Sequence, residues 1–165
     1  MAIAYLMLGS NIGEKRKNLE KAADALAKAG NRILVRSPIY ESEPWGFQHS
    51  EYFYNQLIIL QTEFPPKILL LKILEIEEGM GRIRNSKEYE ARIIDIDIIY
   101  YDKLVLNTES LVIPHPRMAE RRFVLKPLLD LAPDLVHPVN GKTTWEMYRE
   151  CEDELSIKKI DLILN

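Results

Sequence analysis

The sequence contains very little cysteine: Cys151 is the single one among 165 residues. A lone thiol excludes an intrachain disulfide framework and a zinc site built from several cysteines. The sequence also lacks an apolar run long enough to cross a bilayer, and the apolar stretch at residues 2–8 is too short for a signal peptide and has no basic flank. We therefore expect a cytoplasmic protein without a membrane partner.

An excess of charge of one sign is lacking as well. The net charge is −3 with acidic and basic residues mixed along the chain, which excludes the broad positive field that binds nucleic acid non-specifically. There is no repeat, low-complexity tract or linker, and a content of 47% hydrophobic and 28% charged residues is typical of an ordinary globular protein. The length predicts one domain over residues 1–165, which we expect to be a monomer.

Hydrophobic periodicity predicts strands and helices in mixed order. Strands are expected at residues 3–8, 33–39, 52–62, 93–99 and 157–164, and helices at residues 15–29, 65–78, 118–122, 127–131 and 143–152. The strands at 33–39 and 52–62 would pair as a hairpin with a long loop. Strands and helices that do not strictly alternate favour an α+β sandwich on an antiparallel sheet over a doubly wound parallel sheet.

Two aspartates lie two residues apart in the strand predicted at residues 93–99. A period of two puts Asp95 and Asp97 on one face of the strand and Ile94, Ile96 and Ile98 on the other. Two neighbouring carboxylates repel each other, so a cation is expected between them. Mg²⁺ suits this place because it takes one or two carboxylates and fills its other positions with water and phosphate oxygens. The alternative is a strand with one face in water.

Three arginines, Arg82, Arg84 and Arg92, lie within one loop's reach of the aspartates. Cations beside carboxylates are what a nucleotide-triphosphate site requires, although a salt-bridged surface loop would contain the same residues. The turn around Ser10 has the position of a phosphate-binding loop, between a strand and a helix. Its glycines have the wrong spacing and no Gly-Lys-Ser/Thr follows, so we interpret it as a plain turn.

A second candidate group combines aromatic side chains with an amide: Trp45, Phe53, Tyr54, Asn55 and Phe123. The phenylalanines alone would be ordinary core residues. Asn55 stands inside an apolar run, where its amide needs partners for both donor and acceptor. A flat heterocycle with an amide-like edge would supply them.

His115 is held between two prolines, where its imidazole could donate to a phosphate or cap a nearby carbonyl. The other two histidines, His49 and His137, are distant in the sequence, and no Cys or His stands at ligand spacing from another. A transition-metal site therefore has little support.

Seven strings of this sequence, in one order, resemble the 6-hydroxymethyl-7,8-dihydropterin pyrophosphokinase family, which prepares the pterin half of folate. They are LGSNIG (8–13), SPIYESEPWG (37–46), FYN (53–55), GRIR (81–84), RIIDIDIIYYD (92–102), VIPHPRM (112–118) and RRFVLKPLLDLAPDLVHP (121–138). The resemblance implies a ferredoxin-like α/β sandwich. It also implies transfer of pyrophosphate from ATP to 6-hydroxymethyl-7,8-dihydropterin, giving AMP and the pterin diphosphate.

The resemblance assigns roles to individual residues of this chain. It implies that Asp95 and Asp97 hold two Mg²⁺ ions and act in catalysis together with Arg82 and Arg92 from a loop. The residues that it places on the ATP side are Glu77, Arg84, Ile98, His115 and Arg121. Those that it places around the pterin are Ser42, Trp45, Phe53, Asn55 and Phe123, with Phe53 and Phe123 stacked on the ring.

One stretch departs from the family pattern. The family usually has a tryptophan followed by glycine and proline just before the arginine of the aspartate strand, whereas this chain has Tyr89, Glu90 and Ala91. Tyr89 can still cover a closed site as an aromatic lid. Glu90 adds negative charge near the phosphates, so we expect the difference to change loop closure and affinity more than the chemistry.

Two other functions remain as alternatives. A nucleotidyltransferase also joins a Gly-Ser turn to paired aspartates, but its aspartates follow closely, whereas 84 residues separate Ser10 from Asp95 here. A non-catalytic ferredoxin-like binding module is the second, although the sequence pI of about 5.7 and the lack of an aromatic RNA-binding strand weigh against RNA as its ligand. The products of turnover discriminate among the three.

Overall fold

The computed structural model describes residues 1–43, 51–81 and 93–160. Its main sheet has six strands, and every pairing in it is antiparallel. The strands run in the order β5 (Asp95–Tyr101), β1 (Ala2–Ser10), β4 (Phe53–Thr62), β3 (Tyr40–Ser42) and β8 (Ile157–Lys159), and β2 (Arg32–Arg36) also pairs with β4. A second sheet consists of β6 (Leu106–Asn107) and β7 (Val112–Ile113).

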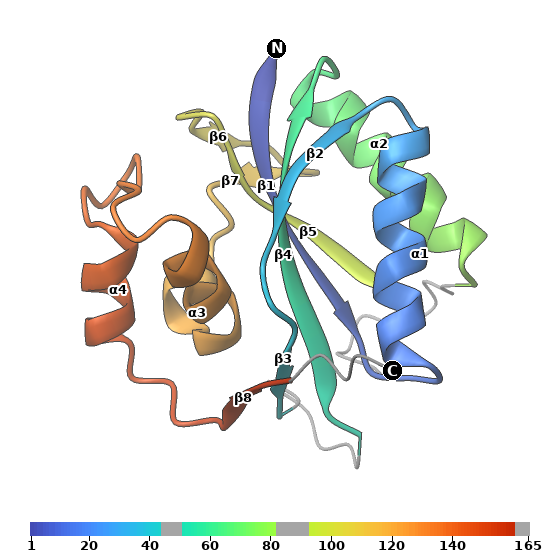
Figure 1. Cartoon of the computed structure of the whole chain (residues 1–165). Helices are drawn as coiled ribbons and strands as arrows, with labels where there is room; N and C mark the ends of the chain where they lie inside the picture. The colour runs from blue at the N-terminus through green and yellow to red at the C-terminus, as the bar shows by residue number, and fades with distance from the viewer. Residues whose placement is uncertain (44–50, 82–92, 161–165) are drawn as a thin grey trace.

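Helices cover both faces of the main sheet (Figure 1). One face packs against α1 (Lys15–Lys28) and α2 (Pro66–Gly79). The other packs against α3 (Arg122–Leu131), which follows the short 3-10 helix η1 (Met118–Glu120) and has α4 (Thr144–Glu150) at its side. The predicted α+β sandwich with a mainly antiparallel sheet and flanking helices is confirmed, and no helix in the described ranges is long and apolar enough to span a membrane.

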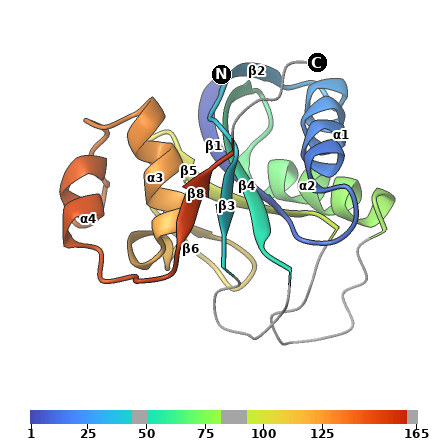
Figure 2. The same ribbon diagram turned by 60° about the horizontal axis from the view of Figure 1, so that its bottom comes forward.

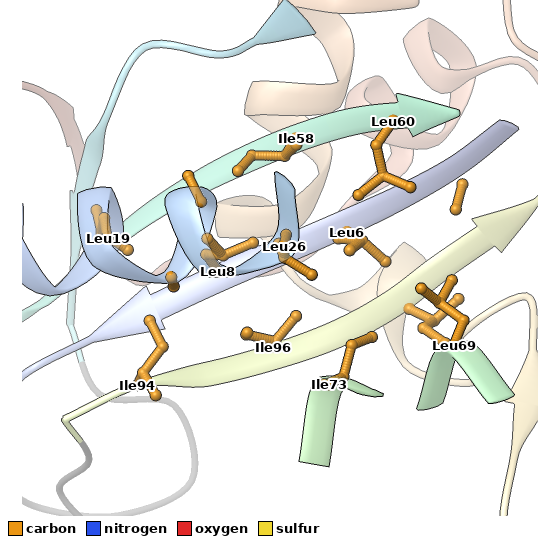
Figure 3. Close-up of a cluster of buried hydrophobic side chains, with 14 of the residues drawn as sticks. Leu6, Leu8, Leu19, Leu26, Ile58, Leu60, Leu69, Ile73, Ile94 and Ile96 are labelled. Carbon is orange, nitrogen blue, oxygen red and sulfur yellow. The ribbon is translucent and has the colours of Figure 1, made fainter. Parts of the chain in front are cut away.

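Alternate residues of the central strands build the core between the sheet and α1 with α2 (Figure 3). The strands present their apolar side chains to the same side because successive residues point to opposite faces. The labelled members are Leu6, Leu8, Leu19, Leu26, Ile58, Leu60, Leu69, Ile73, Ile94 and Ile96. A second apolar cluster, with Met7, Leu57 and Ile99, fills the space between the sheet and α3.

Several predicted elements have different bounds. The strand expected at residues 33–39 is two shorter strands, β2 and β3, which both pair with β4 and so confirm the predicted pairing. The two helical segments expected at 118–122 and 127–131 are η1 and a continuous α3 that contains Pro127. Pro127 costs α3 one hydrogen bond, to the Phe123 carbonyl, and burial of its neighbours Val124 and Leu128 against the sheet offsets that loss.

The C-terminal elements match the elements predicted from the sequence more closely. The capping box predicted for Thr143 and Glu146 is present at the start of α4, with both reciprocal hydrogen bonds. The last strand, β8, occupies Ile157–Lys159, at the start of the range in which the sequence predicts it.

Candidate active site

Three strands bring the predicted metal and pterin residues into one row. Gly9 on β1 lies opposite Asp95 on β5 and opposite Asn55 on β4. Since neighbouring strands are about 4.8 Å apart, the backbones of Asp95 and Asn55 are separated by about 10 Å. Residues opposite each other point to the same face of a sheet, and Gly9 has no side chain. The row therefore has a carboxylate at one end, an amide at the other and an open position between them.

The row faces α3 and not α1. Ile94, Ile96 and Ile98 belong to the core beneath α1 and α2, so the alternating Asp95 and Asp97 point to the opposite face. Both aspartates are half-buried. The predicted division of this strand into a carboxylate face and an isoleucine face is thus present in the structure.

Glu77 fixes the backbone of the aspartate strand. Its side chain on α2 is 1% exposed, and its Oε2 accepts a hydrogen bond of 2.9 Å from the backbone N–H of Ile96. Ile96 stands between Asp95 and Asp97 in β5, at the end of the described sheet. Because this buried carboxyl group accepts from the Ile96 amide, Glu77 holds the backbone of the two aspartates in place through their shared neighbour.

His115 is tied to the same strand. Its backbone N–H donates to the Ile99 carbonyl at 3.0 Å, and its ring Nδ1 accepts from the Arg117 N–H at 3.2 Å. Burial lowers the pKa of His115 to about 4, Arg121 and Arg117 lower it too, and Asp95 acts in the opposite direction. With Nδ1 used as an acceptor, a neutral imidazole carries its proton on Nε2. His115 is therefore a neutral imidazole near Asp95, whose Nε2–H could donate to a phosphate or to a carbonyl.

The lowered pKa predicts how acid acts on the free protein. Between pH 6.5 and pH 4 the unfolded chain binds a proton at His115 that the folded chain does not, so the free energy of unfolding falls as the pH falls through this window. We expect His115→Gln to lack this component. Denaturant unfolding of both proteins without ligands, from pH 8 to pH 4, measures it. A constant difference between the two proteins at every pH would contradict the prediction.

Arg121 and Phe123 stand at the start of α3. Arg121 is 7% exposed, and its guanidinium carbon lies 5.7 Å from the centre of the Phe123 ring. The Arg121 charge also lowers the pKa of His115, so the guanidinium lies close to the imidazole of His115. The beginning of α3 therefore combines a buried cation, which could bind a phosphate, with a half-buried aromatic ring, which could stack on a flat ligand.

The amide of Asn55 is oriented by its own strand neighbours. Asn55 is 2% exposed, and its Nδ2 donates to Ser42 Oγ at 2.7 Å and to the Tyr40 carbonyl at 3.3 Å. The sequence suggested that a ligand would satisfy both the donor and the acceptor of this amide. The protein itself satisfies the donor, whereas Oδ1 accepts no hydrogen bond from the described part of the chain and lies toward Gly9. Ser42 thus has a clear function in aiming Asn55.

Gly9 offers a test of the open position. A Cβ added there would lie 3.4 Å from Asn55 Oδ1 and 3.6 Å from Phe53 Cδ1, which are ordinary contacts that the fold tolerates. We expect Gly9→Ala to keep its melting temperature and to weaken binding of a pterin about 5- to 150-fold, since overpacking a filled pocket costs about 1–3 kcal/mol. Calorimetric titration measures it. Gly79→Ala is the control because a Cβ at Gly79 meets nothing within 4 Å, and equal pterin affinity of both variants would refute the open position.

Other predicted site residues are placed differently or lie outside the description. Ile98 directs its side chain into the core beneath α1, so that only its backbone, on β5, could contact a nucleotide. Trp45, Arg82, Arg84, Arg92 and the stretch 89–91 are outside the described residues. Within residues 1–43, 51–81 and 93–160, no group of three or more His, Cys, Asp or Glu side chains could hold a metal. Asp95 and Asp97 are therefore two of the ligands that a metal here would need.

Sequence reasoning missed two contacts that join the site's elements. The Tyr40 hydroxyl on β3 donates to the Asp130 carboxylate on α3, a contact that raises the pKa of Tyr40 in addition to the larger effect of burial. The Asp153 carboxylate accepts a hydrogen bond from the Arg122 N–H at the start of α3. These partners are 90 and 31 positions apart in sequence, so no local pattern could have indicated them.

Known proteins resemble this chain over most of its length. The family model described as 7,8-dihydro-6-hydroxymethylpterin-pyrophosphokinase matches residues 5–133. A protein of Methylorubrum extorquens named 2-amino-4-hydroxy-6-hydroxymethyldihydropteridine pyrophosphokinase is 42% identical over 147 residues, which cover 88% of this chain and 91% of the relative. The folic acid synthesis protein fol1 of Pneumocystis carinii is 41% identical over 149 residues, and this chain spans 20% of its length.

A solved structure supports the fold. The Plasmodium falciparum HPPK-DHPS, crystallised with pteroate, superimposes with a TM-score of 0.73 and covers 90% of this chain, while this chain covers 44% of it. Its sequence identity is 18%. The match of the family model and the identity to the bacterial relative, which the chain covers nearly end to end, are what decide the family, and they favour it over a nucleotidyltransferase or a binding module. The chain belongs to the 7,8-dihydro-6-hydroxymethylpterin-pyrophosphokinase family.

Proposed function

We propose that this chain transfers a pyrophosphoryl group from ATP to the hydroxymethyl group of 6-hydroxymethyl-7,8-dihydropterin, with AMP as the second product. The observation that carries this proposal is the row of Asp95, Gly9 and Asn55. It joins a carboxylate pair suited to a metal-bound triphosphate with an amide suited to a heterocycle, about 10 Å apart across three strands. A pyrophosphokinase must hold these two ligands side by side.

On the ATP side, Asp95 and Asp97 would hold Mg²⁺, as two ions. Their fit rests on donor chemistry: both ligands are hard carboxylate oxygens on one face of one strand, half-buried and fixed by Glu77. When bound, Mg²⁺ supplies charge neutralisation of the triphosphate. His115 would donate from Nε2 to a phosphate oxygen, and Arg121 would add a buried positive charge. Arg82, Arg84 and Arg92 would reach the phosphates from their loop, and the backbone of Ile98 would contact the nucleotide.

On the pterin side, Asn55 would bind the amide-like edge of the ring with Oδ1, because Ser42 and the Tyr40 carbonyl already hold its donor. Phe53 and Phe123 would stack on the two faces of the ring, and Trp45 would close the pocket. The hydroxymethyl group would then point along the row, over Gly9 and toward the aspartates.

The chemistry is an in-line displacement. The pterin hydroxymethyl oxygen forms a bond to the β-phosphorus of ATP, the bond between that phosphorus and the oxygen bridging to the α-phosphate breaks, and AMP leaves with the bridging oxygen. The proton of the hydroxymethyl group goes to solvent. No covalent intermediate with the protein is needed, so the residues of the row act by positioning and by charge.

An assay that separates AMP from free pyrophosphate tests the function. The purified protein is incubated with ATP, Mg²⁺ and 6-hydroxymethyl-7,8-dihydropterin, and the nucleotide and pterin products are separated by chromatography. We expect equal amounts of AMP and pterin diphosphate, and none without Mg²⁺. Release of pyrophosphate would indicate a nucleotidyltransferase, and tight pterin binding without turnover would indicate a binding module. Either result would overturn the proposal.

A further inference from the structure

The proposed pterin pocket has two walls that come from different parts of the chain. One wall is the paired edge of β3 and β4, which presents Ser42, Phe53 and Asn55. The other is the first turn of α3, which presents Phe123. A ring stacked between Phe53 and Phe123 needs these walls at a fixed separation, because stacking and the Asn55 hydrogen bond must form together.

The first wall is held by β8, which pairs with β3 near the C-terminus. β3 has only three residues, and β8 pairs with it on the side away from β4, with Ile157 opposite Ser42 and Lys158 opposite Glu41 (Figure 2). The pairing continues beyond the strands. The Glu43 N–H donates to the Ser156 carbonyl at 3.4 Å, and the Ser156 hydroxyl donates to Glu43 Oε1 at 2.9 Å. Ser42, which aims Asn55, is therefore enclosed between two strands.

The second wall is held by the same segment. The residue in the N-cap position of α3, Arg121, makes no side-chain capping bond. Asp153 supplies it instead, since its Oδ2 accepts from the Arg122 N–H at 2.9 Å while its Oδ1 accepts from the Leu155 N–H at 2.9 Å. A carboxylate at this position satisfies a free amide and opposes the positive end of the helix. Phe123 is the next residue of that turn.

We infer that residues 153–159, here named the C-terminal brace, set the separation of the two pterin walls, with Asp153 and the β8 pairing as positioning elements. The inference rests on the proposed function. The brace contacts the first turn of α3 at one end and Ser42 with Glu43 at the other. It lies beyond residue 133, where the match of the family model ends. The hydrogen bond from the Tyr40 hydroxyl to the Asp130 carboxylate also joins β3 to α3, so we expect the fold to persist when the brace is altered.

Two variants with matched controls test the brace. Asp153→Ala removes the cap, whereas Asp153→Asn keeps one accepting oxygen, which can still cap the Arg122 N–H, and gives up the hydrogen bond from the Leu155 N–H. Lys158→Pro removes a backbone donor from β8, whereas Lys158→Ala removes only an exposed side chain. Asp134→Ala, at an exposed acid, controls for the change in charge. Steady-state kinetics with ATP and the pterin are measured well below the melting temperature of every variant.

We expect Asp153→Ala and Lys158→Pro to raise the KM for the pterin about tenfold while the KM for ATP and kcat change less than about twofold. Asp153→Asn, Lys158→Ala and Asp134→Ala should stay near the unaltered protein. An unchanged pterin KM in folded Asp153→Ala, or an equal rise in both KM values, would overturn the inference. If Lys158→Pro does not fold, the pterin KM of Asp153→Ala compared with that of Asp153→Asn is sufficient to test the inference.

Amide hydrogen exchange separates this inference from the proposed function. Failure of the unaltered protein to bind the pterin would overturn the proposed function and leave the brace to be judged by exchange. In Asp153→Ala and Lys158→Pro we expect faster exchange in both β3 and the first turn of α3 than in the controls, because each variant frees one end of a shared segment. Unchanged exchange at the far wall would show that the two ends are independent, and the brace would be rejected.

Discussion

Asp97→Ala is expected to abolish pyrophosphoryl transfer while the protein stays folded. Asp97 is half-buried on the face of β5 opposite the isoleucine core, so its removal takes away a metal ligand without opening a cavity beneath α1 and α2. The loss in kcat should exceed about 10²-fold, the scale of one preorganised electrostatic contact. The AMP-release assay at saturating Mg²⁺ measures it, and circular dichroism with thermal unfolding shows that the fold persists.

A matched control for Asp97→Ala is Asp24→Ala, which removes a carboxylate from the exposed face of α1. It should keep full activity. If folded Asp97→Ala turned over at a near-normal rate and still required Mg²⁺, the assignment of the metal site to this strand would be wrong.

Asn55→Leu should lose pterin binding far more severely than Phe53→Leu, with ATP binding largely unchanged in both. Leucine in place of Phe53 keeps an apolar wall and gives up stacking worth about 1 kcal/mol. Leucine in place of Asn55 leaves the polar edge of the pterin unpaired, at about 1–3 kcal/mol for each group. The Ser42 hydroxyl loses its partner too. One orphaned group on the pterin, the partner of Asn55 Oδ1, corresponds to a loss of about 5- to 150-fold in affinity, whereas the unpaired Ser42 hydroxyl lowers stability with or without pterin.

Calorimetric titration with the pterin, in the presence of a non-hydrolysable ATP analogue, compares the two variants. A titration with the analogue alone shows whether the ATP side is intact, and melting temperatures show whether the β3 and β4 pairing survives. Equal losses of pterin affinity in Asn55→Leu and Phe53→Leu would mean that Asn55 is a structural amide of its strand, held by Ser42 and Tyr40 for packing alone.

The parts of the site that the sequence predicted are those that depend on neighbouring residues. Alternation alone separated Asp95 and Asp97 from the isoleucines between them, and an amide inside an apolar run was enough to single out Asn55. Which residues face each other across strands depends on register, and a shift of one residue would have moved Gly9 away from both Asp95 and Asn55. The open position in the row therefore required the fold.

Contacts between distant elements could not be predicted for a related reason. Nothing near Glu77 indicates that its carboxylate ends on the Ile96 amide, and a helix glutamate is ordinarily exposed. Nothing near Asp153, which is one of several acidic residues in a polar stretch, indicates that its carboxylate accepts from the Arg122 amide. The α3 bounds were misjudged because Pro127 signals a break locally, whereas packing of the flanking apolar residues keeps the helix continuous.

The hydrogen bond from Ile96 to Glu77 has a further consequence for self-association. β5 stands at the end of the described sheet and is rich in isoleucine, the kind of strand that recruits a strand from another molecule and starts aggregation. Glu77 occupies one of its outward amides, and the carboxylates of Asp95 and Asp97 add repulsion between copies. At the opposite end of the sheet, β8 presents the exposed Lys158 and Lys159. Residues of the proposed metal site thus also make the β5 edge a poor template for edge-to-edge aggregation, and the lysines do the same at β8.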